Sequence, residues 1–137
     1  MSQVQIVSVG RYRRPLINAA EGTVVCLVFP PDNDTLVSSG RNGGRPAVVV
    51  YDLDRLECVH AFHLPGSQTR FLVYSPSGDT LAASNAKQVL LLSHNLSAVR
   101  HTLAHPKQVN AVAFTPDGRR ILTTCTDKLV RVWDPAA

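Results

Sequence analysis

The chain has 137 residues, of which 45% are hydrophobic and 18% are charged, with a formal net charge of +4. This length suffices for one domain with a real core, and the composition argues against disorder. No uncharged apolar run reaches about 18 residues, and near the start an apolar run precedes the arginines, the reverse of a secretory signal. We therefore expect a cytoplasmic or otherwise intracellular protein without a membrane span.

The three cysteines, Cys26, Cys58 and Cys125, are far apart and form no CxxC pair. An odd number without close spacing predicts neither a disulfide framework nor a zinc site. Free thiols that pack as small hydrophobic groups are the expected outcome.

The N-terminal segment, residues 1–19, predicts a strand at Val4–Val9 and a second at Leu16–Ala19, the latter as an outer strand that precedes the first repeat. Three stretches, starting at Val24, Thr69 and Val109, then repeat one pattern. In each, an alternating apolar run ends in an aromatic residue, a proline-containing turn follows, and a second β-like run continues, which predicts an antiparallel hairpin.

The copies align at an aromatic, a proline and an aliphatic position. These are Phe29, Tyr74 and Phe114; Pro31, Pro76 and Pro116; and Leu36, Leu81 and Ile121. The aromatic positions are 45 and 40 residues apart. That spacing fits the period of about 40–45 residues of four-stranded propeller blades.

Further strands complete each copy. Consecutive apolar residues at Ala47–Tyr51, Val89–Leu92 and Leu129–Trp133 predict third strands that are covered on both faces. Mixed polarity at Glu57–Phe62 and Ala98–Leu103 predicts outer strands. Residues 38–44 lack the GxxxxGK[ST] motif of a phosphate-binding loop, so we expect a flexible inter-strand loop there, lengthened by an insertion at Arg41–Arg45.

Residues 105–134 resemble one repeat of the WD-repeat family. His105 stands where the family has the His of its Gly-His pair, Pro116-Asp117-Gly118 matches the first turn, and Trp133-Asp134 is the eponymous dipeptide. Residues 20–52 and 65–93 resemble the repeat more distantly. The resemblance implies an all-β fold over residues 1–137, with about three four-stranded antiparallel blades in an incomplete, open propeller arc.

In that family a His, a Ser or Thr, an Asp and the Trp form a buried hydrogen-bond chain within one blade. By position, the resemblance assigns this structural tetrad to His105, Thr123, Asp127 and Trp133. The Asp would accept from the His ring, the hydroxyl would relay, and the indole N–H would donate. The other copies lack the tetrad residues, so we expect their blades to rely on apolar packing.

Members of the family commonly bind proteins where loops between outer and first strands meet loops between second and third strands. By position, the candidate protein-binding face comprises Gln68, Arg70, Asn85, Gln108, Asn110 and Thr126. The alternative interpretation is that these are ordinary polar residues at strand edges, which rarely carry binding energy.

An enzyme would need a constellation of residues that the sequence does not offer. His60 and His63 form an HxxH pattern, but on a strand their rings would point to opposite faces, a poor geometry for one metal ion. The closely spaced aspartates fit turn chemistry. We predict no catalytic residue, no metal and no cofactor.

The best signal for nucleic acid is the basic patch Arg11, Arg13 and Arg14, which flanks an aromatic residue. A solvated strand end is the alternative, because three basic residues give a weak electrostatic footprint.

Propellers typically have about four to eight blades, whereas this chain supplies three copies. It could therefore be a segment of a longer propeller, a chain whose ring another chain completes, or an arc docked in an assembly. We predict a non-catalytic scaffold for protein–protein interactions with other proteins as partners. A nucleic-acid-associated module that uses the basic patch is the competing hypothesis.

Overall fold

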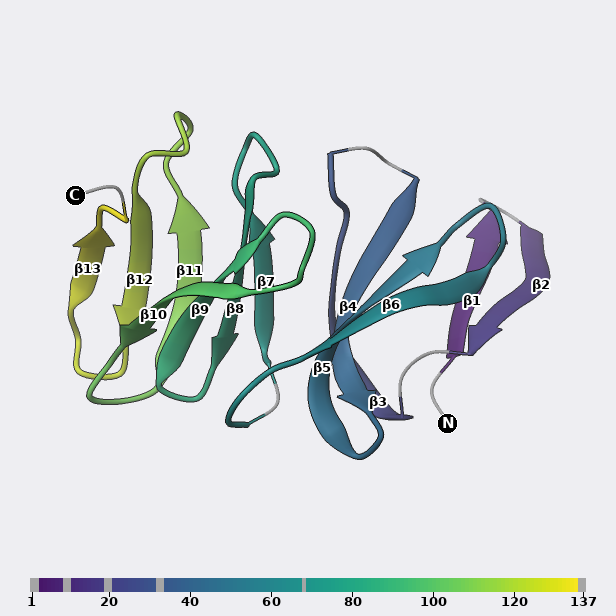
Figure 1. Cartoon of the computed structure of the whole chain (residues 1–137), viewed down its shortest axis with the longest axis horizontal. Coiled ribbons are helices and arrows are strands. Elements are labelled where there is room, and N and C mark those ends of the chain that lie inside the picture. The colour runs from purple at the N-terminus through teal and green to yellow at the C-terminus, as the bar shows by residue number, and fades with distance from the viewer. Residues whose placement is uncertain (1–2, 9–10, 19–20, 32–33, 68, 136–137) are drawn as a thin grey trace.

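The computed structural model describes residues 3–8, 11–18, 21–31, 34–67 and 69–135, with side chains from residue 26 onward. These residues form strands and turns, and the sheets follow one another across the molecule in chain order (Figure 1). Within these ranges no helix has the length and apolarity that a membrane crossing requires. The predicted all-β class is confirmed.

Every sheet is antiparallel, and its neighbouring strands are consecutive in sequence. The N-terminal hairpin consists of β1 (Gln3–Ser8) and β2 (Arg11–Asn18). The first sheet comprises β3 (Glu21–Val28), β4 (Thr35–Asn42), β5 (Arg45–Asp52) and β6 (Glu57–His63). The second sheet comprises β7 (Phe71–Tyr74), β8 (Thr80–Asn85), β9 (Gln88–Ser93) and β10 (Val99–Ala104). The third sheet comprises β11 (Val109–Phe114), β12 (Ile121–Cys125) and β13 (Val130–Trp133).

The three sheets coincide with the three repeats in the sequence. Strand β7 contacts both β3 and β11, so the first strand of each sheet lies beside that of the next. This is the arrangement of inner strands in a propeller, where each sheet is a blade. The predicted architecture of successive antiparallel blades is therefore confirmed.

Apolar side chains fill the spaces between the sheets. Strand β9 contributes to both sides, because successive residues of a strand point to opposite faces. Leu90 and Leu92 join the cluster between the first and second sheets, and Val89 and Leu91 join the cluster between the second and third sheets. The prediction of a strand covered on both faces is confirmed for β9.

Strand β13 departs from that prediction. Val130 and Val132 are 63% and 60% exposed, whereas the alternating Arg131 and Trp133 are half-buried. Trp133 packs on the cluster shared with the second sheet. In the described part of the chain, the other face of the third sheet has no sheet against it, so only the inward-facing residues of β13 are covered.

The expected flexible loop at residues 38–44 is wrong. Strand β4 continues through Asn42 and β5 resumes at Arg45, which leaves Gly43 and Gly44 as a tight turn. Both glycines have positive φ, 61° and 75°. That combination matches the right-handed twist of a hairpin, so the supposed insertion lengthens two paired strands.

In the N-terminal segment, β1 is as long as expected and β2 is longer. The predicted strands overlap β1 and β2, but Val9 and Ala19 lie outside the described residues. Strand β2 pairs with β1 in a separate two-stranded sheet and also contacts β6 of the first sheet. The structure describes only the backbone of this hairpin.

The turns between the first and second strands are built alike in the second and third sheets. The amides of Gly78 and Gly118 donate to the carbonyls of Ser75 and Thr115, three residues earlier. Both glycines have positive φ, 80° and 74°. Each also faces the turn proline of the preceding sheet: a Cβ on Gly78 would lie 2.7 Å from Cγ of Pro31. The turns therefore stack on one another from sheet to sheet.

Candidate functional site: the loop face and its supporting network

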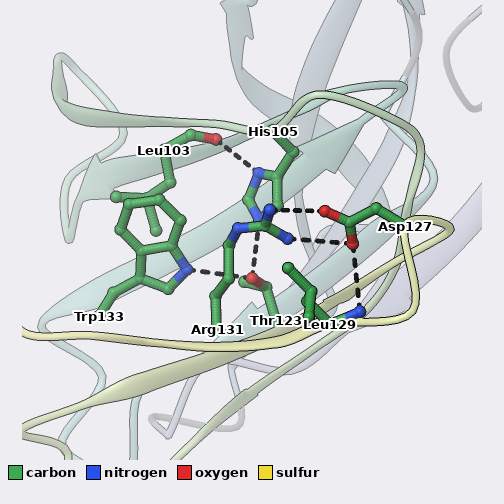
Figure 2. A network of polar contacts seen from close by, with 7 residues as sticks. All are labelled: Leu103, His105, Thr123, Asp127, Leu129, Arg131 and Trp133. Atoms are coloured by element: carbon green, nitrogen blue, oxygen red, sulfur yellow. Dashed lines mark hydrogen bonds and ion pairs between the residues drawn. The ribbon is translucent and has the colours of Figure 1, made fainter.

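A series of hydrogen bonds runs from β13 and β12 of the third sheet, through His105, to β10 of the second sheet (Figure 2). Trp133 Nε1–H donates to Thr123 Oγ1 at 3.0 Å, and Thr123 Oγ1 lies 2.7 Å from His105 Nε2. His105 Nδ1 lies 3.0 Å from the carbonyl oxygen of Leu103. Thr123 and His105 are buried, and the rings of His105 and Trp133 lie 5.4 Å apart at 55°.

The two ends of this series fix its direction. An indole N–H can only donate, and a carbonyl can only accept. In the neutral imidazole, His105 Nδ1–H therefore donates to Leu103, which leaves Nε2 to accept from the hydroxyl of Thr123. Thr123 in turn accepts from Trp133. All the donors along the series are used, so this arrangement satisfies the buried polar groups without an ion.

Asp127, the fourth residue assigned by position, takes part in a different interaction. Its carboxylate accepts two hydrogen bonds from the guanidinium of Arg131, at 3.2 and 2.6 Å, and one from the amide of Leu129 at 3.2 Å (Figure 2). The Arg131 hydrogen bond lowers the pKa of Asp127 to about 2. A bidentate, charge-assisted pair is stronger than a bond to a neutral ring, which explains why the ring of His105 turns to Leu103 instead.

The structure thus joins three of the four assigned residues and adds two that the sequence analysis did not include. Arg131 follows Asp127 by four residues, and this Asp-xxx-Arg spacing was the available signal. Leu103 contributes only its backbone, which no side-chain pattern reveals.

The first sheet retains part of the same network, so the expectation that it relies on apolar packing alone is wrong. The hydroxyl of Ser38 donates to that of Tyr51 at 3.3 Å, and both side chains are fully buried. In the repeat alignment these two residues occupy the places of Thr123 and Trp133. That correspondence was readable in the sequence.

The loop face is the surface made by residues 64–67 and 69–70 before β7, by residues 105–110, which lead into and include the start of β11, and by the β8–β9 and β12–β13 turns, residues 86–87 and 126–129. Backbone hydrogen bonds tie these pieces together. The amides of His105 and Val109 donate to the carbonyls of Lys87 and Ala86, and the amide of Thr126 donates to the carbonyl of Gln108. The network described above lies directly beneath, because His105 and Asp127 belong to this face.

The six candidate binding residues differ in exposure. Arg70, Asn110 and Thr126 are exposed and Gln108 is half-buried, whereas Gln68 lies outside the described residues. Asn85 is buried, and its amide nitrogen donates to the carbonyl of Pro65 at 3.3 Å. Asn85 therefore holds a loop in place, and the surface that a partner could touch is carried by Arg70, Asn110 and Thr126.

Comparison with known families adds a finding that fits this geometry. The sequence matches the WD domain, G-beta repeat family over residues 14–44 and 97–134, which together make up half of the chain. The chain belongs to the WD-repeat family. These two matches contain the β3–β4 hairpin of the first sheet and the whole third sheet. The middle copy lies outside them.

Several curated proteins are similar to this WD-repeat chain over part of their length. A Periodic tryptophan protein 2 homolog of Neurospora crassa is 28% identical over 77% of the chain and 12% of its own length. The small ribosomal subunit protein RACK1 of Candida albicans is 24% identical over 82% of the chain and 37% of its own length. The COMPASS component SWD1 of Saccharomyces cerevisiae is 31% identical over 49% of the chain and 17% of its own length. The chain thus spans a small part of each relative.

The other candidate sites have these positions. Arg11, Arg13 and Arg14 lie on β2, but their side chains are outside the description. The rings of His60 and His63 each contact a different backbone carbonyl, that of Leu96 and that of Asn42, both at 3.0 Å. Among the described residues, no group of three or more His, Cys, Asp and Glu side chains converges as a metal site would require.

Proposed function

We propose that this WD-repeat chain is a non-catalytic intracellular scaffold for protein–protein interactions and forms one part of a larger propeller or multiprotein assembly. The observation that carries the proposal is the loop face. Its segments are tied together by backbone hydrogen bonds, and Arg70, Asn110 and Thr126 remain exposed on it. A surface that is already rigid loses little conformational entropy when a partner binds.

The polar residues beneath the loop face support a structural rather than a catalytic role. His105 has both ring nitrogens in hydrogen bonds, and the carboxylate of Asp127 is occupied by Arg131 and the amide of Leu129. A general base must be able to reach a substrate proton, and these two groups are directed toward their neighbours.

The proposal that the chain is part of something larger is supported by the outer face of the third sheet. Val130 and Val132 are each more than half exposed there. Clustered exposed apolar residues mark surfaces that another protein segment covers. The names of two relatives, a ribosomal subunit protein and a COMPASS component, are also those of members of assemblies.

Affinity purification of the tagged full chain, quantified by mass spectrometry, tests the loop face. Because Arg70 and Asn110 are exposed, changing Arg70→Glu with Asn110→Ala should leave the melting temperature unchanged. It should reduce recovery of specific partners by about tenfold, the effect of about 1.4 kcal/mol. Arg55→Glu is the matched control, since Arg55 is exposed in the β5–β6 turn at the opposite end of the sheets. Undiminished recovery with the double variant would contradict the assignment of this face.

The competing nucleic-acid function receives no support from the relatives named above. We therefore do not propose it as a second function. Steeply salt-dependent binding of RNA or DNA that disappears when Arg11, Arg13 and Arg14 are all changed to Ala would support that function.

A further inference from the structure

A groove lies between the second and third sheets at the end opposite the loop face. It has a volume of about 450 Å³. Its second-sheet wall comes from the start of β8, from β9 and from β10, and its third-sheet wall comes from the β11–β12 turn and the segment after β13. Both walls come from described residues of the second and third sheets and the segments that adjoin them.

The floor of this groove is apolar. Leu91 and Ile121 belong to the buried cluster between the two sheets, and the half-buried Phe114 packs against that cluster. Pro135 adds a further apolar surface at the edge. An apolar floor of this size suits one or two aliphatic or aromatic side chains, as ligand sites commonly combine apolar walls with a few polar groups.

The rim of the groove is cationic. Arg100 and Arg119, from opposite walls, are both exposed, and His101 stands beside Arg100 on β10. Asp134 is the one carboxylate among the lining residues. The nearby carboxylate of Asp117 accepts from the hydroxyl of Thr115 at 2.6 Å and from the backbone amide of Arg119 at 2.9 Å. Among the described residues, no ion pair within 4 Å engages Arg100 or Arg119, although the charge of Arg119 contributes to the lowered pKa of Asp117. Both guanidinium groups are exposed and can still reach an external carboxylate.

The equivalent groove between the first and second sheets provides an internal comparison. It has a volume of about 380 Å³, and the repeat alignment places Asp79 at the position of Arg119. Among the residues that the structure describes, neither lysine nor arginine lines it. The ring of His60, which corresponds to His101, spans it to the carbonyl of Leu96 at 3.0 Å. The cationic rim is therefore particular to the second pair of sheets and is not a general feature of the fold.

We propose that the groove between the second and third sheets binds a short acidic segment of a partner protein, which places an apolar side chain on Phe114 and Ile121 and carboxylates against Arg100 and Arg119. A peptide fits better than a nucleic acid, because two arginines above an apolar floor give little phosphate neutralisation. This inference rests on the scaffold function proposed above but uses a surface distinct from the loop face.

Fluorescence anisotropy with the full chain tests the proposal. The probe is a labelled hexapeptide of sequence EDLFEE, compared with QNLFQQ, which lacks the charge, and EDSSEE, which lacks the apolar pair. We expect EDLFEE to bind at least about tenfold more tightly than either, with an affinity that weakens as salt screens the carboxylates. Absence of binding up to millimolar peptide, or equal binding of all three, would overturn the proposal.

Charge reversal locates the binding site. Arg100→Glu with Arg119→Glu should weaken EDLFEE binding by at least about tenfold. The control Arg45→Glu with Arg55→Glu has the same net charge and also changes two exposed arginines, both on the first sheet, so it should change binding less than about twofold. If the two double variants weaken binding equally, the attraction is a property of the net charge and the groove is not the site.

Two further measurements distinguish peptide binding in the groove from the loop-face function and from nucleic-acid binding. The loop-face variant Arg70→Glu with Asn110→Ala should bind EDLFEE as the unchanged chain does, so loss of the loop-face function and loss of the groove function are distinguishable. A labelled poly(dT) oligonucleotide should neither bind more tightly than EDLFEE nor displace it. Tighter binding of the oligonucleotide would assign the cationic rim to nucleic acid and overturn the peptide proposal.

Discussion

Thr123 is the central link of the third sheet's network, because it donates to His105 and accepts from Trp133. The energetic consequence of removing a link depends on how many buried groups are left without a partner. Loss of Trp133 Nε1–H removes one bond, whereas loss of the Thr123 hydroxyl leaves both neighbours unsatisfied. Removing the Thr123 hydroxyl, in the middle of the hydrogen-bond series, should therefore lower stability more than removing the Trp133 N–H at its end.

We predict that Thr123→Val lowers the free energy of unfolding by about 2–3 kcal/mol, and that Trp133→Phe lowers it by about 1 kcal/mol or somewhat more through the smaller ring. Urea denaturation measures both. Thr124→Val is the matched control, since Thr124 is the next residue of β12 and points to the other face of the sheet. It should be nearly neutral. An unchanged melting temperature in Trp133→Phe would contradict a structural role for the network.

The pair of Asp127 and Arg131 should make stability depend on acid pH. An unfolded aspartate titrates near pKa 3.9, whereas the pKa of Asp127 in the folded chain is about 2 because Arg131 hydrogen-bonds its charged form. A lowered folded-state pKa stabilises the fold above about pH 4, and that contribution disappears as the pH falls toward 2. We predict that Asp127→Asn destabilises the chain at pH 5 and has a smaller effect at pH 2.5.

Urea midpoints at the two pH values measure this difference, and Arg131→Gln provides a second route to it. Without the guanidinium, the carboxylate of Asp127 loses its main stabilising partner. The stability of this variant should therefore fall less between pH 5 and pH 2.5 than that of the unchanged chain. A destabilisation by Asp127→Asn that is equally large at both pH values would show that the charge of Asp127 does not carry the effect.

At the scale of the elements, the turns set the spacing between sheets. Gly78 and Gly118 share a positive φ, but a Cβ on Gly118 would sit at an ordinary 3.5 Å from Cδ of Pro76. At Gly78 the corresponding distances to Cγ and Cδ of Pro31 are 2.7 and 2.8 Å, closer than real Cβ contacts. The junction between the first and second sheets therefore depends on the absence of a side chain at Gly78. The junction between the second and third sheets depends less on its absence at Gly118.

We predict that Gly118→Ala costs about 1 kcal/mol, the strain of a left-handed conformation in a residue with a Cβ. Gly78→Ala should cost that amount and about 1–3 kcal/mol more, because the rigid ring of Pro31 must move. Chemical denaturation of the two variants gives the comparison. Equal costs would show that the turns separate freely when a methyl group is added.

Much of the strand and turn structure is predictable from the sequence. The repeated aromatic, proline and aliphatic positions predicted each hairpin, since turn chemistry and period-two alternation are local signals. Asn42-Gly43-Gly44-Arg45 also carries a hairpin signal, which the expectation of a flexible loop at residues 38–44 overlooks. What local patterns do not give is how many faces of a strand are covered: β9 lies between two sheets, whereas β13 has a neighbouring sheet on one side only among the described residues.

The site is less predictable from the sequence than the fold, because it depends on which residues of different strands and sheets meet. Position in a repeat located His105, Thr123 and Trp133 in one hydrogen-bond chain, but Asp127 bonds Arg131 because a nearby guanidinium is the stronger partner. The buried position of Asn85 and the cationic groove at Arg100 and Arg119 depend on how sheets meet. Such juxtapositions join residues from two repeats, which no single repeat encodes.

At the scale of the whole molecule, the outer face of the third sheet governs association. Val130 and Val132 form an apolar surface beside the free edge of β13, to which no described strand pairs. An unpaired edge next to an apolar face favours pairing with another chain. If an additional protein segment covers this face in the assembly, the same surface should make the isolated chain self-associate.

We predict that sedimentation velocity of the 137-residue chain shows concentration-dependent oligomers, and that Val132→Lys shifts them toward monomer because a charge at the centre of this face must be desolvated in the contact. Val59→Lys is the matched control, since Val59 is an exposed valine on β6 of the first sheet. It should leave the oligomers unchanged. A wild-type chain that sediments as a clean monomer at all concentrations would contradict the need for a cover, and equal effects of both lysines would mean that net charge alone controls association.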